Sequence, residues 1–247
     1  MARKTKTSKT ASKPARKPPG NPAFAPVRWL RRWALRIVLA PVGLVVVLVL
    51  LFSVVNPPIT HTMWVEYGKY GRLEREWVPL EQVAPVMARA VVAAEDANFC
   101  QHWGFDLGAI RAAIAEGASR GGSTLTQQVV KNVFLWQGRS WIRKALETAI
   151  TPLVEAVWSK RRIVEVYLNV AEMGEGLFGV AAASRSYFKV APGDLTARQA
   201  ALIAAVLPSP RSRSVTAPSD RVRQRAAAIA DGAATIRADG RSACFED

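Results

Sequence analysis

One long uncharged segment constrains this 247-residue chain more than any other feature. Residues 37–55, IVLAPVGLVVVLVLLFSVV, contain no charged side chain. With the two residues before it, the segment would span roughly 30 Å as a helix, about the thickness of a bilayer's hydrocarbon core. We therefore predict a transmembrane helix over residues 35–55, which the following Asn56-Pro57-Pro58 would end.

A cleaved secretory signal is the competing interpretation of this segment. It is disfavoured because the apolar run exceeds the roughly 15 residues usual for such a signal, and no A-x-A-like cleavage site follows. Eleven Lys and Arg and no acid precede the run, within residues 1–36. By the positive-inside rule, the N-terminus is expected in the cytoplasm, the helix in the inner (cytoplasmic) membrane, and residues 56–247 in the periplasm.

The N-terminal tail, residues 1–34, accounts for most of the net charge of +15, since the rest of the chain holds all 19 acidic residues. Its Lys, Arg, Ser, Thr and Pro content predicts disorder. A membrane surface explains the positive charge, so no nucleic-acid partner is expected.

The exported part is predicted to be a mostly α-helical domain over residues 56–240, followed by a C-terminal tail, residues 241–247. Apolar residues recur there at three- and four-residue spacings, and Ser or Thr precedes several of these runs. Residues 64–78 are predicted to be irregular or strand-like. Helices are expected at residues 83–94, 110–116, 123–133, 141–160, 162–170, 179–187, 195–207 and 221–230.

The two cysteines, Cys100 and Cys244, leave two interpretations open. In an exported domain they could form a disulfide. Two free buried thiols are the alternative, because the geometry that a disulfide requires cannot be read from sequence.

Residues 121–132, GGSTLTQQVVKN, form the densest polar segment of the chain. A core segment would not bury so many polar groups together, because each costs free energy without a partner. Glycines permit close backbone approach, and a helix N-terminus suits an anion. Lys131 is a candidate point charge for a phosphate, with Gln127 and Gln128 beside it. The alternative is an ordinary capped helix with a solvent-exposed lysine.

Adjacent acids, Glu95 and Asp96, follow the apolar face of the helix expected at residues 83–94. A partly desolvated carboxylate at such an edge has a pKa raised toward the range useful to a general base. Solvated acids at the end of a helix are the alternative.

A second carboxylate, Glu147, lies four residues after Arg143, with Arg139 and Lys144 nearby. One interpretation is a helix-surface ion pair. The other is a basic wall for a diphosphate beside a carboxylate.

Several other chemistries find no support in the sequence. The two histidines are in no H-E-x-x-H arrangement, so no metal site is expected. There is no nucleophile elbow or P-loop, and Ser186-Tyr187-Phe188-Lys189 matches S-x-x-K without the K-T-G and S-D-N partners that such a serine enzyme needs.

Taken in order, these motifs resemble the glycosyltransferase family 51 domain of peptidoglycan glycosyltransferases, over roughly residues 60–215. Four motifs in the family's order make the resemblance highly specific. They are Glu95-Asp96-x-x-Phe99-x-x-His102-x-Gly104, the GGSTLTQQ of residues 121–128 with Lys131-Asn132, Arg143-Lys144-x-x-Glu147, and Lys160-Arg161-Arg162-Ile163-x-Glu165-x-Tyr167-Leu168-Asn169.

The resemblance implies a lysozyme-like, mostly α-helical fold and the polymerisation of lipid II. A growing glycan chain would pass from undecaprenyl diphosphate to the 4-hydroxyl of lipid II, with inversion, to form β-1,4 linkages. The implied partners are lipid II, the nascent glycan strand, the membrane, and divisome or other cell-wall synthesis proteins.

The resemblance also implies roles for single residues. Glu95 would take the acceptor proton, Lys131 and Arg139 would neutralise the leaving diphosphate, and Glu147 would orient basic neighbours or the acceptor. No tightly bound cofactor is implied; Mg²⁺ assists some members by screening the diphosphate, and no ligand set for it is evident in this sequence. Further residues would bind substrate: Asp96, Phe99, His102, Ser123, Thr124, Gln127, Gln128, Asn132, Arg143 and Lys144.

Two other functions compete with this one. A muramidase or lytic transglycosylase would use a similar cleft with Glu95 as acid, and a catalytically silent scaffold would need no cleft. The Lys and Arg cluster disfavours the first, because a glycan-cleaving enzyme has no diphosphate to hold. Four apolar side chains are candidates for lipid contact, with core packing as the alternative: Phe105, Phe134, Leu135 and Trp136.

Overall fold

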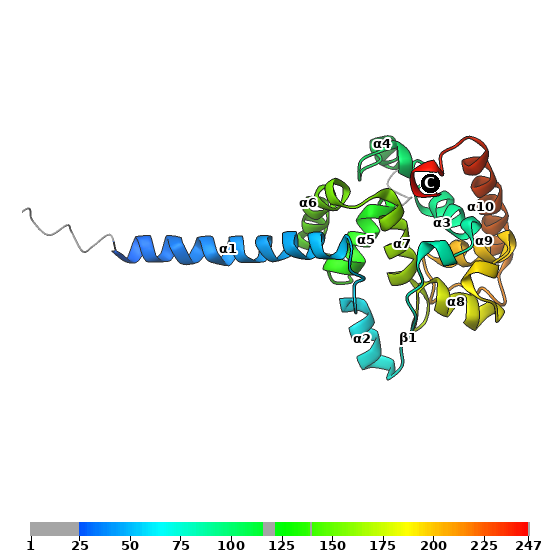
Figure 1. The fold of residues 1–247 in the computed structure, drawn as a ribbon, viewed down its shortest axis with the longest axis horizontal. Helices are drawn as coiled ribbons and strands as arrows, with labels where there is room; N and C mark the ends of the chain where they lie inside the picture. Colours follow the sequence, from blue (N-terminus) through cyan, green and yellow to red (C-terminus); the bar gives the residue numbers. More distant parts are fainter. Residues whose placement is uncertain (1–24, 116–121, 139, 247) are drawn as a thin grey trace, which may run out of the picture. The chain divides into compact units, whose positions relative to one another are not determined.

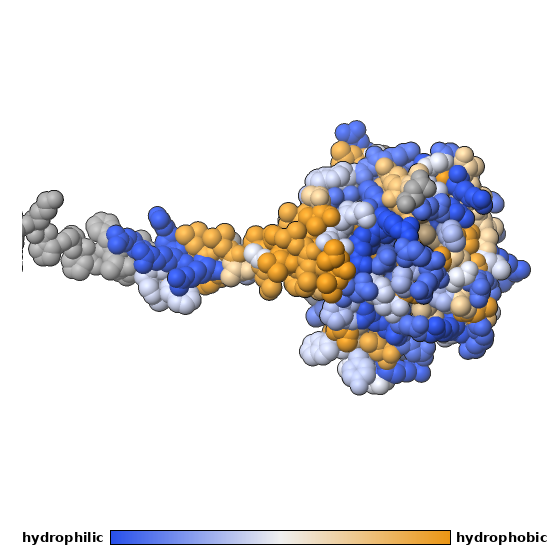
Figure 2. Space-filling model, in the orientation of Figure 1, coloured by the Kyte–Doolittle hydropathy of each residue, from blue (hydrophilic) through white to orange (hydrophobic). Residues whose placement is uncertain are grey.

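A computed structural model describes residues 25–115, 122–138 and 140–246. The chain divides into two compact units, residues 1–44 and 45–247. Helix α1 (Ala25–Phe52) begins in the first unit and ends in the second. Residues 28–52 are long and apolar enough to cross a membrane by length and composition. Figure 2 shows this hydrophobic surface in orange, after a hydrophilic beginning in blue.

The second unit is mostly helical, as the sequence predicts (Figure 1). A small sheet has the strand order β1-β3-β2, with β1 parallel and β2 antiparallel to β3. Its strands are β1 (Glu74–Arg75), β2 (Glu172–Gly174) and β3 (Leu177–Phe178). The 3₁₀ turns are η2 (Leu80–Gln82), η3 (Phe99–Gln101) and η4 (Pro192–Asp194). The helices are α2 (His61–Tyr70), α3 (Pro85–Glu95), α4 (Leu107–Ala115), α5 (Leu125–Phe134), α6 (Trp141–Val157), α7 (Lys160–Val170), α8 (Gly179–Phe188), α9 (Ala197–Val206), α10 (Asp220–Ala238) and α11 (Ala243–Glu246).

Side-chain caps determine where many of these helices begin. In each of six helices, a Ser or Thr hydroxyl accepts a hydrogen bond from a backbone N–H of the first turn, which would otherwise lack a partner. The capping residues are Thr60, Thr124, Ser140, Ser159, Thr196 and Ser219. Two groups of helices then form the core: α3, α9 and α10 pack together, and α5 packs on α6 and α7.

The structure differs from the sequence prediction at residues 64–70, where α2 occupies the first part of the segment 64–78 that was expected to be irregular or strand-like. The strand β1 lies in the remainder of that segment. The Thr60 hydroxyl accepts from the Met63 N–H, and Gly71 ends the helix at φ 66°. Met63 and Glu66 are buried on one face. Exposed aromatic side chains on the other face concealed the helical period in the sequence.

The C-terminus also differs, because residues 241–247 include a packed element. α11 lies against α7 and η3, and the Phe245 side chain is only 1% exposed. In addition, α10 continues to Ala238, eight residues beyond the predicted end of the last helix at residue 230.

The last turns of α1 are bound within the second unit. The indole Nε1 of Trp158 donates to the Val49 carbonyl at 2.7 Å. The Arg162 guanidinium donates to the Phe52 carbonyl at 3.1 Å and to the Val55 carbonyl at 2.9 Å. Carbonyls at the end of a helix lack partners within it, so these two side chains join the domain to the end of α1.

Candidate active site

Glu95 is the last residue of α3, and its carboxylate is held among polar side chains. The Gln128 amide Nε2 donates to Glu95 Oε2 at 2.9 Å. The other oxygen, Oε1, is buried without a hydrogen-bond partner and lies 3.8 Å from a guanidinium nitrogen of Arg225. Burial raises the pKa of Glu95, while the Gln128 bond and the charges of Arg225 and Lys131 oppose that rise. The carboxylate therefore has the desolvated environment that a general base needs.

Lys131 lies one turn after Gln128 on α5 and lines a cleft of the domain. This cleft, called the α2 cleft below, has a volume of about 490 Å³, and its walls come from α2, α5, α7 and residues 207–211. Gln128, Lys131 and Asn132 all line it. Burial lowers the pKa of Lys131, although the carboxylates of Glu147 and Glu95 oppose the shift. Lys131 is thus a partly buried cation in a cleft, not a solvated surface lysine.

Glu147 is buried on α6 and pairs with two cations of its own helix. Arg143 Nη1 lies 2.8 Å from Glu147 Oε2, and the Lys144 ammonium pairs with Oε1. Lys144 also donates to the Ser123 hydroxyl at 3.1 Å. With a side chain only 4% exposed, Glu147 is not part of a solvated surface pair. Arg139, the other predicted phosphate ligand, lies outside the described residues.

A hydrogen-bonded framework connects the chain after α3 to the start of α5. Asp96 Oδ1 lies 2.8 Å from His102 Nε2, and its Oδ2 accepts from the Leu125 N–H at 2.9 Å. Thr124 and Gln127 form a capping box. Each of these four predicted substrate-binding residues thus has a hydrogen-bonded group within the protein, although His102 Nδ1 is buried without a partner. This framework fixes Glu95 relative to Gln128.

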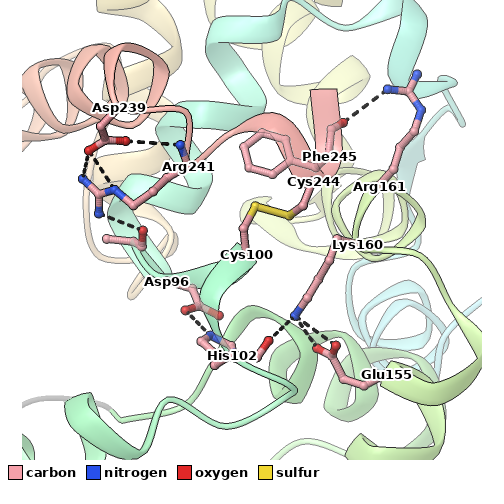
Figure 3. The surroundings of a disulfide bond; sticks show 11 residues. Asp96, Cys100, His102, Glu155, Lys160, Arg161, Asp239, Arg241, Cys244 and Phe245 are labelled. Carbon is pink, nitrogen blue, oxygen red and sulfur yellow. Dashed lines mark hydrogen bonds and ion pairs between the residues drawn. A yellow bond between two sulfur atoms is a disulfide. The ribbon is translucent and has the colours of Figure 1, made fainter. Parts of the chain in front are cut away.

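Phe99, also predicted to bind substrate, is a fully buried core residue in the structure. Its ring lies 4.3 Å from the Lys160 ammonium and 6.4 Å from the Phe245 ring. Next to it, Cys100 and Cys244 form a disulfide that joins η3 to α11 (Figure 3). This settles the choice between a disulfide and free thiols that the sequence left open.

A second cavity, called the Glu95 cavity below, has a volume of about 220 Å³. It is lined by Glu95, Asp96, Ser123 and Thr124, and by residues of α4. Several predicted site residues therefore line two hollows, and the Glu95–Gln128 hydrogen bond joins a residue of one to a residue of the other. Such an arrangement offers two neighbouring binding places, one on each side of this bond.

One group of described residues has the composition of a metal site: the ligand atoms of Asp96, His102 and Asp106 lie within 4.8 Å of one another. Both Asp96 oxygens already have partners, and Asp106 accepts from the Ala109 N–H and the Asn98 amide. Mg²⁺ prefers oxygen ligands in octahedral geometry. This group therefore does not fit Mg²⁺, and no step of the reaction is assigned to it.

Sequence reasoning did not find three neighbours of this site. Tyr167 donates to Gln128 Oε1 at 3.4 Å, and the charges of Arg213 and Arg225 act on Glu95. Tyr167 lies in the fourth motif, but the two arginines follow all four motifs. Only the fold, which packs α10 on α3, brings them to Glu95.

Comparison with known proteins identifies the family of this chain. A family model described as Transglycosylase matches residues 63–234. A biosynthetic peptidoglycan transglycosylase of Jannaschia sp. (strain CCS1) is 61% identical over 82% of this chain and 85% of its own. Those of Cronobacter sakazakii and Rhodospirillum centenum are 47% and 46% identical, over 78% and 83% of this chain and 84% and 90% of their own. The chain therefore belongs to the transglycosylase family, as the four motifs predict.

Proposed function

We propose that this transglycosylase polymerises peptidoglycan glycan chains by one inverting displacement. The acceptor is lipid II, and the donor is a glycan chain on undecaprenyl diphosphate. Glu95 takes the proton of the acceptor 4-hydroxyl as that oxygen bonds to the donor's anomeric carbon. The bond from this carbon to the diphosphate breaks, and its electron pair leaves with the diphosphate.

One observation carries this proposal: Gln128 binds the Glu95 carboxylate while Lys131, one turn further on the same helix, lines the α2 cleft. A base and a cation on opposite sides of one reacting bond are what such a displacement needs. We assign the acceptor sugar to the Glu95 cavity and the donor diphosphate to the α2 cleft. By its place in the motif, Arg139 joins Lys131 at the diphosphate.

Glu147 has a positioning role in this scheme. It is buried and bound to Arg143 and Lys144, so it is poorly placed to accept a further proton. Its carboxylate instead holds these two cations in place, Lys144 beside Ser123 and Arg143 beside the Gly138 carbonyl. The buried carboxylate keeps Arg143 and Lys144 in place, and the three groups together still carry a net positive charge.

The anchor fits a substrate that stays in a bilayer. We propose that α1 crosses the inner membrane once, with its basic start in the cytoplasm and the catalytic domain in the periplasm. The apolar length of residues 28–52 supports the crossing. The Cys100–Cys244 disulfide supports an oxidising compartment for the domain.

Glycan cleavage is the alternative chemistry for a carboxylate in such a cleft. The cations argue for synthesis, because hydrolysis of a glycan produces no diphosphate. The relatives' names agree, since each is called biosynthetic.

A direct experiment incubates the full-length protein in detergent with labelled lipid II and then adds a muramidase. We expect a polymer that the muramidase degrades to disaccharide units. Lipid II that stays intact in both detergent and vesicles would refute the polymerase assignment. Cleavage of preformed glycan by the protein alone would support the lytic alternative.

A further inference from the structure

A third cavity of the domain is lined by three arginines and lies close to Glu95. It has a volume of about 340 Å³, and its lining residues are Arg213, Ser219, Arg221, Val222 and Arg225. We call it the arginine cavity. Among the described residues no acidic side chain lines it, so the lining itself contains no negative charge to balance the arginines.

Two of the arginines are placed by the backbone around the cavity. Arg213 Nη1 donates to the Ala205 carbonyl at 3.0 Å, and Arg225 Nη2 donates to the Ala94 carbonyl at 3.3 Å. Each guanidinium has five N–H donors, so both retain donors for a ligand. The nearest carboxylate to Arg225 is Glu95, and 3.8 Å between the charged atoms is too long for a strong hydrogen bond.

Arg221 has no side-chain partner among the described residues, although it sits in the first turn of α10 beside two other cations. The neighbouring Arg223, in contrast, is paired with Asp220 and with the Pro218 carbonyl. Like charges that converge repel one another, and Glu95, 3.8 Å from Arg225, offsets only part of that repulsion. An anion placed between the arginines would remove more of it. The cavity therefore has the chemistry of an anion site.

We propose that the arginine cavity binds an anionic group of the lipid-linked acceptor, namely the carboxylates of the peptide that its disaccharide carries. This inference rests on the proposed function, because it requires that acceptor to lie at Glu95. A carboxylate accepts two parallel N–H bonds from a guanidinium, which gives geometric specificity as well as affinity.

The position of the cavity favours the peptide over the acceptor's diphosphate, the other anionic group of this substrate. The diphosphate is joined to the lipid chain and stays near the membrane. Within the second unit, the end of α1 contacts α5 through the Phe52 and Phe134 rings, 6.1 Å apart. α10 packs instead on α3 and α9, on the side of the domain away from α5 and α6 (Figure 1).

The test compares two lipid II substrates, one with free peptide carboxylates and one with those groups converted to carboxamides. Arg221→Gln removes the unpaired cation, and Arg223→Gln is the matched control from the same helix. With the free carboxylates, we expect Arg221→Gln to raise KM about tenfold with kcat unchanged, the size of one lost charge-assisted bond. With the carboxamides, the wild type should show the same rise and Arg221→Gln little further change.

Each other result contradicts part of the inference. An equal rise in KM for both substrates would assign the cavity to the diphosphate and refute the peptide. A KM like that of Arg223→Gln with both substrates would refute an anion site altogether. Polymerisation by the wild-type protein verifies the proposed function in the same experiment, so the two ideas can fail separately. A second variant, Arg221→Lys, keeps the charge and should recover most of the affinity, with thermal unfolding to verify that the fold is intact.

Discussion

At the scale of single residues, the balance of forces on Glu95 decides how the site responds to pH. Burial favours the neutral acid, whereas the Gln128 hydrogen bond and the charges of Arg225, Lys131 and Arg213 favour the carboxylate. A general base works only when ionised, so activity should fall as pH drops through the pKa of Glu95. Each neighbour of Glu95 is thus a means of moving the acid limb of the pH profile.

Removing the Gln128 amide should move that limb to higher pH. The hydrogen bond lowers the pKa of Glu95 and so opposes the rise that burial causes. Gln128→Leu removes this opposition, and the pKa of Glu95 should therefore rise. We expect the acid limb of kcat/KM for lipid II to shift upward, with activity retained on its high-pH side. Gln101→Leu, at an exposed position of η3, is the control. A profile that falls in height without moving would show that Gln128 contacts substrate and does not tune Glu95.

Glu95→Gln should remove the base while keeping most of the fold. General base catalysis contributes about 10²–10⁴-fold, and we expect a loss of kcat in that range. Asp231→Asn changes an exposed carboxyl of α10 and should retain most activity. The assay is glycan polymerisation in detergent, with circular dichroism to compare folds. A Glu95→Gln variant with wild-type kcat would require another base.

In the proposed mechanism, Lys131 stabilises the negative charge that develops on the leaving diphosphate. A cation in a partly buried cleft stabilises such charge more strongly than one in water. Lys131→Gln should therefore reduce kcat by about 10²–10³-fold, whereas Lys189→Gln, at an exposed lysine, should not. A rise in KM with kcat unchanged would instead mean that Lys131 binds the substrate as strongly in the ground state as in the transition state.

At the scale of elements, the sequence predicted best where a helix had both an apolar period and a cap. Helices α5 and α9 begin with Thr capping boxes and lie within two residues of their expected bounds. α2 was missed because its apolar face is narrow and aromatic side chains cover its outer face. In the site, the motifs were sufficient to select Glu95 and Lys131 as candidates. The structural role of Asp96 could not be predicted, because its carboxylate accepts from the Leu125 N–H, and no local sequence pattern contains such a long-range contact.

The disulfide between η3 and α11 should contribute measurably to stability. It joins residues 144 positions apart, and α11 adds the Arg89–Glu246 ion pair and the buried Phe245 to the same contact. Replacing both cysteines with serine should lower the free energy of unfolding by about 2–5 kcal/mol. Urea unfolding of the full chain in detergent measures this. Wild-type protein treated with a reductant should lose a similar amount, and no change in either sample would show that the bond does not constrain the unfolded chain.

At the scale of the whole molecule, anchor and domain both present apolar surface. Beyond α1, the second unit exposes Trp64 of α2 at 66% and Trp141 of α6 at 80%. Of the four apolar side chains that the sequence singled out for lipid contact, Leu135 is buried, and Phe134 packs against Phe52 and Trp158. A domain with exposed aromatic and aliphatic side chains near the end of an apolar helix is suited to lie against a membrane surface.

The outer face of α6 allows a direct test of that surface. Ile142, Leu146, Leu153 and Val157 are all exposed and recur at spacings that place them on one stripe of the helix. Burial of this stripe in lipid would contribute about 25 cal/mol per Å² of apolar area. That free energy would hold the active site at the depth of a substrate embedded in a bilayer. Ile142→Ser with Leu146→Ser should therefore raise KM for lipid II in vesicles and leave turnover in detergent unchanged. Thr148→Ser, exposed on the same helix but away from the stripe, is the control. An equal loss in vesicles and in detergent would mean that the stripe supports the fold or the site itself, because detergent removes the need to reach a bilayer.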